Sequence, residues 1–284
     1  ENLKKEQKNG NPYNLAIARY NIGSFCQENG VYTEAIDQFN KAIFLLENKK
    51  HDSLYLNLVN RLGIIHMELK NYNHAESYFQ KAILESKTLN DLAFSKSNLG
   101  SCYEKKGNYI KSLEYQNESL KVYSELNNLK GISVVNENIG SIYEDLEKYA
   151  LAKHYFEKAL AIHDDKKDTR LANILNNIGD IYRKTSSLEN GLIFTKQALE
   201  IAKLIGDKKE EASAYKDLSK NYSLAENYKD AFNTLVLFLA LDEENTRIHN
   251  ANQASALQTI YDTKKKESQI ELLVQNSKVD KAQK

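Results

Sequence analysis

Proline is almost absent from this sequence, which contains one, Pro12, in 284 residues. Because proline interrupts helices, its scarcity favours long helices, and even the linkers between them lack it. A long apolar run is also missing: the longest, from Leu235 to Leu241, is far shorter than the roughly 20 residues that cross a bilayer. Hydrophobic residues at 41% and charged residues at 27% are typical of a soluble protein, so the totals predict a soluble, mostly helical chain.

The chain has no net charge, because 39 Lys and Arg balance 39 Asp and Glu. The charges are interspersed, whereas a nucleic-acid interface needs an excess of basic residues on one face. The six histidines are scattered without the spacing of metal ligands, and the sequence contains no nucleophile with its base and no glycine-rich phosphate loop. We therefore expect a region with no catalytic site, no metal and no cofactor that binds no nucleic acid.

What the sequence does contain is a repeat. Small residues recur at steps of 40, 37, 40, 39 and 40 residues, at Gly23, Gly63, Gly100, Gly140, Gly179 and Ser219. Twelve residues after each landmark comes another small residue, at Ala35, Ala75, Ser112, Ala152, Gly191 and Ala231. A large apolar residue often follows four positions later, as in Phe39, Phe79, Phe156 and Leu235. Residues three or four apart share a helix face, so the pattern predicts a two-helix unit repeated six times, in which small residues let the two helices approach closely.

A turn with its own signature separates the two helices of most units. Gly or Asn precedes Tyr, as in Gly30-Val31-Tyr32, Asn71-Tyr72, Gly107-Asn108-Tyr109 and Asn227-Tyr228. Gly and Asn tolerate the left-handed conformation that ends many helices, so we expect them to adopt it here. The fifth unit departs from the pattern, with Ser187-Leu188 at the turn and Gly191 in place of alanine. We expect its helix pair to be the loosest of the six.

The two cysteines, Cys26 and Cys102, lie at nearly equivalent places in units one and three. A disulfide requires Cα atoms within about 7 Å, and two helices separated by a whole unit do not come that close. We therefore expect two small buried side chains that form no disulfide.

These features together resemble the tetratricopeptide repeat. The resemblance covers residues 13–241 and rests on Asn-aliphatic-Gly triplets in the first helix, at Asn21-Ile22-Gly23, Asn98-Leu99-Gly100, Asn138-Ile139-Gly140 and Asn177-Ile178-Gly179. It implies an all-α fold, a right-handed superhelical solenoid of about six helix pairs, followed by a long C-terminal helix. Residues 1–12 would form an N-terminal extension, and residues 242–284 a capping helix that continues into a juxtamembrane linker helix.

The segment after the repeats carries a narrower resemblance. Residues 257–273 are similar to the stretch that joins tetratricopeptide sensor regions to a membrane helix in sensor histidine kinases, and in related DNA-binding regulators, of Bacteroidetes-type bacteria. This implies a periplasmic region of a membrane-bound receptor that forms homodimers, with the transmembrane helix and the kinase outside this chain. A stripe of spaced apolar residues further predicts that the start of the segment caps the sixth unit. The stripe consists of Ile248, Ala251, Ala254, Leu257 and Tyr261.

A stack of helix pairs has a concave surface lined mainly by the first helix of each unit. Because that surface is polar with few apolar members, it suits an extended peptide better than a compact apolar ligand. Helical spacing places the following candidate peptide-binding residues on it: Tyr20, Asn21, Asn57, Asn60, Ser97, Asn98, Glu137, Asn138, Asn176, Asn177, Arg183 and Lys216.

Asparagine stands two residues before the landmark in four units, at Asn21, Asn98, Asn138 and Asn177. An amide offers a donor and an acceptor, so it can pair with a peptide backbone of any sequence. The repeats also resemble the peptide-binding arrays of bacterial quorum-sensing receptors, in which Asn at this place has that role. The alternative is that these amides bridge neighbouring helices within the stack. Acidic residues toward the first four units and basic residues toward the last two would in addition orient a peptide with an acidic end.

Two functional hypotheses follow. The first is the ligand- or peptide-sensing region of a two-component sensor histidine kinase, which signals through its C-terminal helix. The second is a free-standing cytoplasmic adaptor or peptide-pheromone receptor that binds an extended peptide in the groove. An enzyme is disfavoured, because the sequence has no set of residues to carry a reaction.

Overall fold

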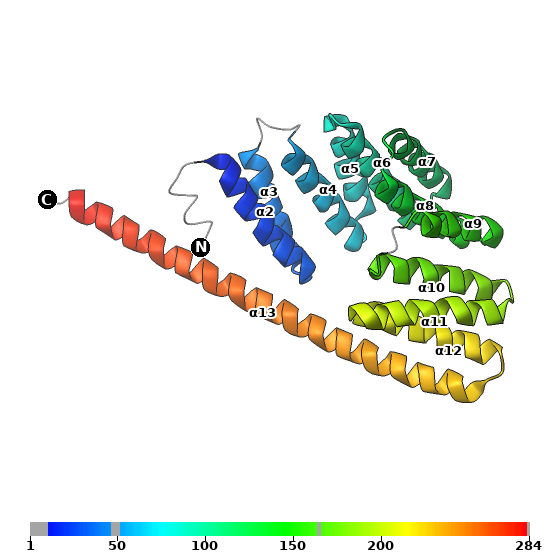
Figure 1. Ribbon diagram of the computed structural model, residues 1–284. Coiled ribbons are helices and arrows are strands. Elements are labelled where there is room, and N and C mark those ends of the chain that lie inside the picture. The colour runs from blue at the N-terminus through cyan, green and yellow to red at the C-terminus, as the bar shows by residue number, and fades with distance from the viewer. Residues whose placement is uncertain (1–10, 47–51, 164–165, 283–284) are drawn as a thin grey trace.

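The computed structural model describes residues 11–46, 52–163 and 166–282. In these residues every regular element is a helix, and the helices form six consecutive antiparallel pairs, which confirms the expected all-α solenoid (Figure 1). The pairs are α2 (Pro12–Glu28) with α3 (Tyr32–Leu45), α4 (Ser53–Glu68) with α5 (Tyr72–Glu85), α6 (Leu89–Lys105) with α7 (Tyr109–Glu125), α8 (Leu129–Asp145) with α9 (Tyr149–Ala161), α10 (Thr169–Lys184) with α11 (Leu188–Ile205), and α12 (Lys208–Leu224) with α13 (Tyr228–Ala282). Residues 1–10 of the expected N-terminal extension lie outside the described residues.

Three of the landmark glycines, Gly23, Gly63 and Gly140, allow an aromatic ring of the second helix to lie directly on the first. A Cβ atom added to Gly23 would lie 2.4 Å from the ring of Phe39. The same clash would occur at Gly63, where the ring of Phe79 is 2.5 Å away. The absence of a side chain at Gly23 and Gly63 therefore makes room for the rings of Phe39 and Phe79.

The fifth helix pair is packed more closely than we expected. A Cβ atom at Gly179 would lie 3.2 Å from the carbonyl oxygen of Gly191, and one at Gly191 would lie 3.1 Å from the carbonyl oxygen of Gly179. The expectation of a loose pair is wrong, because a glycine on each helix lets the two backbones touch.

The turns between paired helices also differ from expectation. The left-handed residue is Gly30 in unit one and Gly107 in unit three, but it is a residue with a side chain in the other four units. These residues are Lys70, Glu147, Ser186 and Glu226, with φ between 56° and 61°. The asparagines of the turn signature come one residue later; Asn108, for example, accepts a hydrogen bond from the Lys111 backbone amide and so caps the second helix.

Apolar contacts between units form a row of clusters along the solenoid. Leu160 of α9, for example, packs with Ile174 and Ile178 of the next unit. Cys26 and Cys102 are both buried and unpaired, as expected, and burial raises the pKa of each thiol to about 11. In the described part of the chain, no helix combines the length and the apolar character needed to cross a membrane.

The last helix decides the overall shape. The helices from α2 to α12 follow an arc, and α13 runs back from the sixth unit across the open side of that arc to the first unit (Figure 1). There the Gln253 amide donates to the Gly30 carbonyl at 3.1 Å, and Lys264 forms an ion pair with Glu34. Ala256 is only 1% exposed and joins the apolar cluster of unit one. The chain therefore closes on itself into a ring.

Unit one is shaped to accept this helix. In units two to five, the two positions that correspond to the site where α13 meets unit one carry a pair of stacked rings. An example is Tyr103 with Tyr115, whose ring centroids are 5.6 Å apart. Unit one has Cys26 and Gln38 at the corresponding positions, and both are buried. The smaller side chains leave space for α13.

The part of α13 that docks is not the apolar stripe expected to cap unit six. Ile248, Leu257 and Tyr261 of that stripe are exposed, as are Ala251 and Ala254. Residues on a neighbouring face instead contact unit one, because the helix continues without a break past the expected boundary at 241 and so extends from the sixth unit to the first (Figure 1). That contacting face includes Gln253, Ala256, Ile260 and Lys264.

Candidate functional site

A cavity of about 540 Å³ lies between the first helices of units three and four. The side chains of Phe94 and Val134 give it an apolar part, and Ser97, Asn98 and Asn138 give it a polar part. The structure thus brings together three of the twelve candidate residues. The cavity is further lined by Asn90, Asp91, Ser101, Tyr123, Asn128, Lys130, Gly131 and Arg170.

Next to this cavity lies a buried amide, Gln116 of α7, which has no solvent exposure. Its Nε2 donates to the Ser97 carbonyl at 3.0 Å and to the Ser101 hydroxyl at 3.3 Å. Its Oε1 accepts from the Ser97 hydroxyl at 3.0 Å and from Asn138 at 3.4 Å. A buried amide with all these partners is well satisfied, so it fixes the side chains that line the cavity.

The asparagine row is partly engaged inside the stack. The Asn98 amide donates to Asn60 Oδ1 at 3.2 Å, and the Asn138 amide donates to the Ser97 hydroxyl at 3.2 Å. Asn60 is buried and donates to the Leu56 carbonyl and to the Ser95 hydroxyl. The donor groups of Asn98 and Asn138 therefore bridge neighbouring units, which is the structural role that the sequence left open.

Two candidates of the first two units, Tyr20 and Asn57, contact a cation. Arg61 donates to the hydroxyl of Tyr20 at 3.1 Å and to Asn57 Oδ1 at 3.2 Å, and its guanidinium lies 5.2 Å from the centre of the Tyr20 ring. Asn21 is exposed on α2. Arg61 stands where four other units have asparagine, and here it ties units one and two together.

The candidates of the last two units lie apart from the cavity. Asn176 is buried and donates to Asp217 at 2.8 Å, which joins α10 to α12. Asn177 is half-buried on α10, and Lys216 is exposed with its ammonium group 5.6 Å from the centre of the Phe238 ring.

One carboxyl group near the cavity has an unusual pKa. Burial raises the pKa of Glu137 to about 7, although the nearby guanidinium of Arg170 opposes the shift. Glu137 Oε1 lies 3.5 Å from Arg170 Nε, and Arg170 also donates to the Lys130 carbonyl. Near neutral pH the group is therefore divided between its neutral and its ionised form.

The expected charge gradient along the groove is largely cancelled by local ion pairs. Lys184 lies 2.6 Å from Glu144 and 2.9 Å from Asp180, and Arg183 also pairs with Asp180. Burial would raise the pKa of Asp180, but the hydrogen bonds from Lys184 and Arg183 lower it. The basic residues of the fifth unit thus neutralise carboxylates of the stack rather than face the solvent unpaired.

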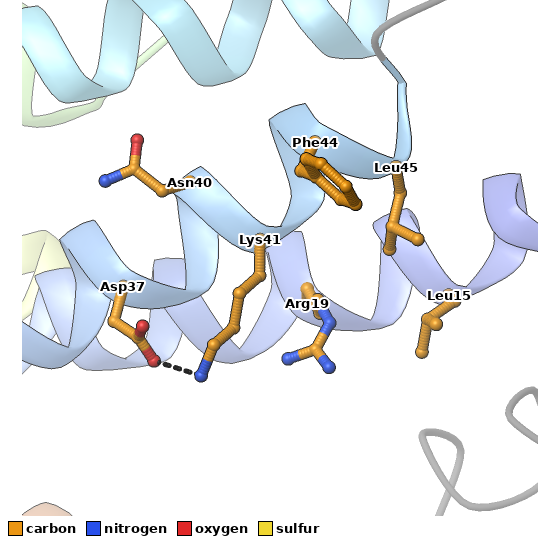
Figure 2. Close-up of a pocket in the computed structure, with 7 residues that line it drawn as sticks. All are labelled: Leu15, Arg19, Asp37, Asn40, Lys41, Phe44 and Leu45. Carbon is orange, nitrogen blue, oxygen red and sulfur yellow. Dashed lines mark hydrogen bonds and ion pairs between the residues drawn. The ribbon is translucent and has the colours of Figure 1, made fainter.

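A second cavity, of about 350 Å³, lies on unit one between α2 and α3 (Figure 2). Leu15, Phe44 and Leu45 lie at one end, and at the other end Lys41 pairs with Asp37 at 2.6 Å. None of the candidate residues lines it, so it provides a comparison for experiments on the groove.

Sequence reasoning missed two residues that shape the site, Gln116 and Arg170. Gln116 is on a second helix, whereas all twelve candidate residues lie on first helices. The sequence nevertheless contains a signal for Gln116, because this residue stands where units one, two and four have Phe39, Phe79 and Phe156. A polar residue at a position that is aromatic in other repeats indicates a local polar network. Arg170 lies at the start of α10, and only the superhelical stacking brings it to the edge of the cavity.

The paired helices, the closely packed small residues and the concave cavity define a helical-repeat scaffold. The profile of the tetratricopeptide repeat matches residues 56–88, 91–165 and 170–244. The chain belongs to the tetratricopeptide-repeat family. No curated protein sequence matches it significantly.

Solved structures share the fold at low sequence identity. BtubC from P. vanneervenii superposes with a TM-score of 0.65 and 18% identity, over 74% of this chain and 91% of BtubC. The Rap conjugation gene regulator of plasmid pLS20, in complex with the Phr* peptide, gives a TM-score of 0.61 and 14% identity, over 83% of this chain and 75% of Rap. A signal-transduction ATPase from Pyrococcus horikoshii with a tetratricopeptide repeat sensor gives 0.65 and 18%, over 84% of this chain and 36% of the ATPase.

Proposed function

We propose that this chain is a peptide-binding interaction region that holds an extended peptide on its concave surface, centred on the cavity between α6 and α8. The observation that carries this proposal is the cavity itself, which combines the exposed ring of Phe94 with hydrogen-bonding groups from two consecutive units. An extended peptide presents both apolar side chains and backbone polar groups, so it matches a lining of this kind. The Rap regulator that shares the fold is solved with a peptide, which supports the same class of ligand.

The test uses a phage-displayed library of random peptides selected on the whole chain. Phe94→Arg introduces a charge into the cavity and should weaken binding of the selected peptides at least tenfold. Phe44→Arg makes the same change at the exposed ring of the unit-one cavity (Figure 2) and should leave binding unchanged. A selection that yields no peptides, or peptides that bind Phe94→Arg as well as the wild type, would contradict the proposal.

A second candidate function is the sensing region of a membrane-bound receptor. It rests on the resemblance of residues 257–273 and on the continuous helix α13, which passes unit one and would carry a change of the ring toward a further module. In this case the region would be periplasmic and dimeric. The test is the coding sequence downstream: an apolar run of about 20 residues supports the receptor, and a stop codon supports a free-standing adaptor.

A further inference from the structure

The sixth unit keeps an apolar face that the other units use for stacking. Twenty residues after the landmark, units one to four carry Ile43, Ile83, Leu120 and Leu160, and each packs into an apolar cluster with the first helix of the next unit. The corresponding residue of unit six is Leu239, which is 54% exposed. Leu239 therefore occupies the position at which other units pack on the next unit, but within the described chain it makes no such contact.

Three further residues extend this surface, which we call the sixth-unit stacking face. Tyr228 is 67% exposed, Phe232 is 66% exposed and Leu235 is 40% exposed. With Leu239 they are spaced by four, three and four residues, so they lie on one side of α13. The corresponding tyrosines of other units, such as Tyr72 and Tyr149, are half-buried in clusters between units. A contiguous apolar face of this kind marks an interaction surface.

The five existing contacts between units show what fits such a face. Each is made by a first helix that runs antiparallel to the second helix before it. In α4, α8 and α10 that helix carries large apolar residues at i, i+3, i+7 and i+10. They are Tyr55, Leu58, Leu62 and Ile65; Ile132, Val135, Ile139 and Ile142; and Leu171, Ile174, Ile178 and Ile181.

We propose that the sixth-unit stacking face binds an amphipathic helix of a partner protein that carries apolar residues at i, i+3, i+7 and i+10. This partner helix packs on unit six in the way that the first helix of each later unit packs on the unit before it. Because it runs antiparallel to α13, its N-terminal end lies beside Asp242 and Glu243, which follow the face and are exposed. Basic residues there complement these carboxylates.

A second copy of this chain does not offer a suitable helix. In α4, α8 and α10 most of the pattern is already buried in contacts between units, and its first residue in α8 and α10 is half-buried. In α2, the first helix that has no unit before it, Ile22 belongs to the apolar cluster on which Ala256 and Ile260 of its own α13 dock. The occupant is therefore a helix from another protein.

The test uses one of the chain's own stacking helices as the probe. A fluorescein-labelled synthetic peptide of residues 129–146, which covers α8, is titrated with the whole chain and followed by fluorescence anisotropy. Binding should be saturable and should weaken at least tenfold in Phe232→Glu and in Leu239→Glu. The matched control is Leu237→Glu on the same helix: Leu237 is 45% exposed, but other units carry Lys41, Lys81 or Glu118 at its position. This control should bind as the wild type does.

Two results would overturn the proposal. One is a peptide that fails to bind, or that binds Leu239→Glu as tightly as Leu237→Glu. The other is a wild-type dimer in analytical ultracentrifugation that Leu239→Glu dissociates, because the face would then belong to a second copy. Phe94→Arg should leave binding of the α8 peptide unchanged, which separates this test from that of the groove.

Discussion

The ammonium group of Lys264 lies 2.5 Å from the carboxylate of Glu34 and so joins the last helix to the first unit. Glu34 also accepts a hydrogen bond from Gln38, and Gln38 accepts one from Arg19, so the chain of contacts runs from α13 through α3 to α2. The hydrogen bond from Lys264 to Glu34 raises the pKa of Lys264. Together with the hydrogen bond from Gln253 to the Gly30 carbonyl, this contact closes the ring.

Ala256→Glu should open the ring. The substitution places a carboxylate in the apolar cluster of unit one, and a buried unpaired charge is too costly to keep. The radius of gyration measured by small-angle X-ray scattering should increase. Ala254→Glu makes the same change at an exposed position of the same helix and should not alter it. Equal radii for the two variants would show that α13 does not hold the ring closed.

Glu137→Gln should remove part of the pH dependence of stability. The folded pKa of about 7 lies above the ordinary value of 4.5, so the folded state keeps this proton at pH values at which the unfolded chain has lost it. The free energy of unfolding of the wild type should therefore fall as the pH rises from about 4.5 to 7. The amide that replaces the carboxyl group cannot ionise, so the variant should be about 1 to 3 kcal/mol more stable than the wild type at pH 8 and similar to it at pH 4.

Urea denaturation at the two pH values measures this difference. Glu157→Gln, at an exposed carboxyl of α9, provides the control and should show the pH dependence of the wild type. A Glu137→Gln variant that is less stable than the wild type at pH 8 would mean that the ion pair with Arg170 outweighs the cost of burial.

Glu147→Gly should stabilise the chain. Glu147 has φ 56°, a left-handed conformation that costs a residue with a side chain about 1 kcal/mol and costs glycine little. Gly107→Ala is the reverse change at the equivalent turn, with φ 74° and open space around the added Cβ, so it should destabilise by about 1 kcal/mol. The midpoints of urea unfolding should move in opposite directions, and a shift of both in one direction would rule out the backbone as the cause.

Asn138→Ala should lower stability by about 1 kcal/mol, because it removes hydrogen bonds to Ser97 and Gln116. Asn177 is the equivalent residue of unit five, and the described structure shows no side-chain hydrogen bond for it, so Asn177→Ala should change stability by less than about 0.5 kcal/mol. Thermal melting followed by circular dichroism distinguishes the two. If Asn177 contacts a bound peptide, Asn177→Ala should weaken peptide binding at unchanged stability.

Much of this architecture could be predicted from the sequence. The recurrence of Gly23, Gly63 and Gly140 with an aromatic residue sixteen positions later specifies a helix pair, because contacts between paired helices are local. Burial of Cys26 and Cys102 followed from the same register. The candidate site was predicted in part: Asn98 and Asn138 meet at one cavity because they recur at the same place in consecutive units, and Ser97, which precedes Asn98, lines the same cavity.

Two features depend on the tertiary structure alone. Arg170 reaches the cavity, and Lys264 reaches Glu34, only because small rotations between successive units add up to a particular curvature of the arc. The sequence by itself determined the repeating unit, its six copies and the apolar face that each copy offers to the next. The accumulated geometry of the stack decided that the last helix returns to the first unit, because no local pattern records a contact between residues more than two hundred positions apart.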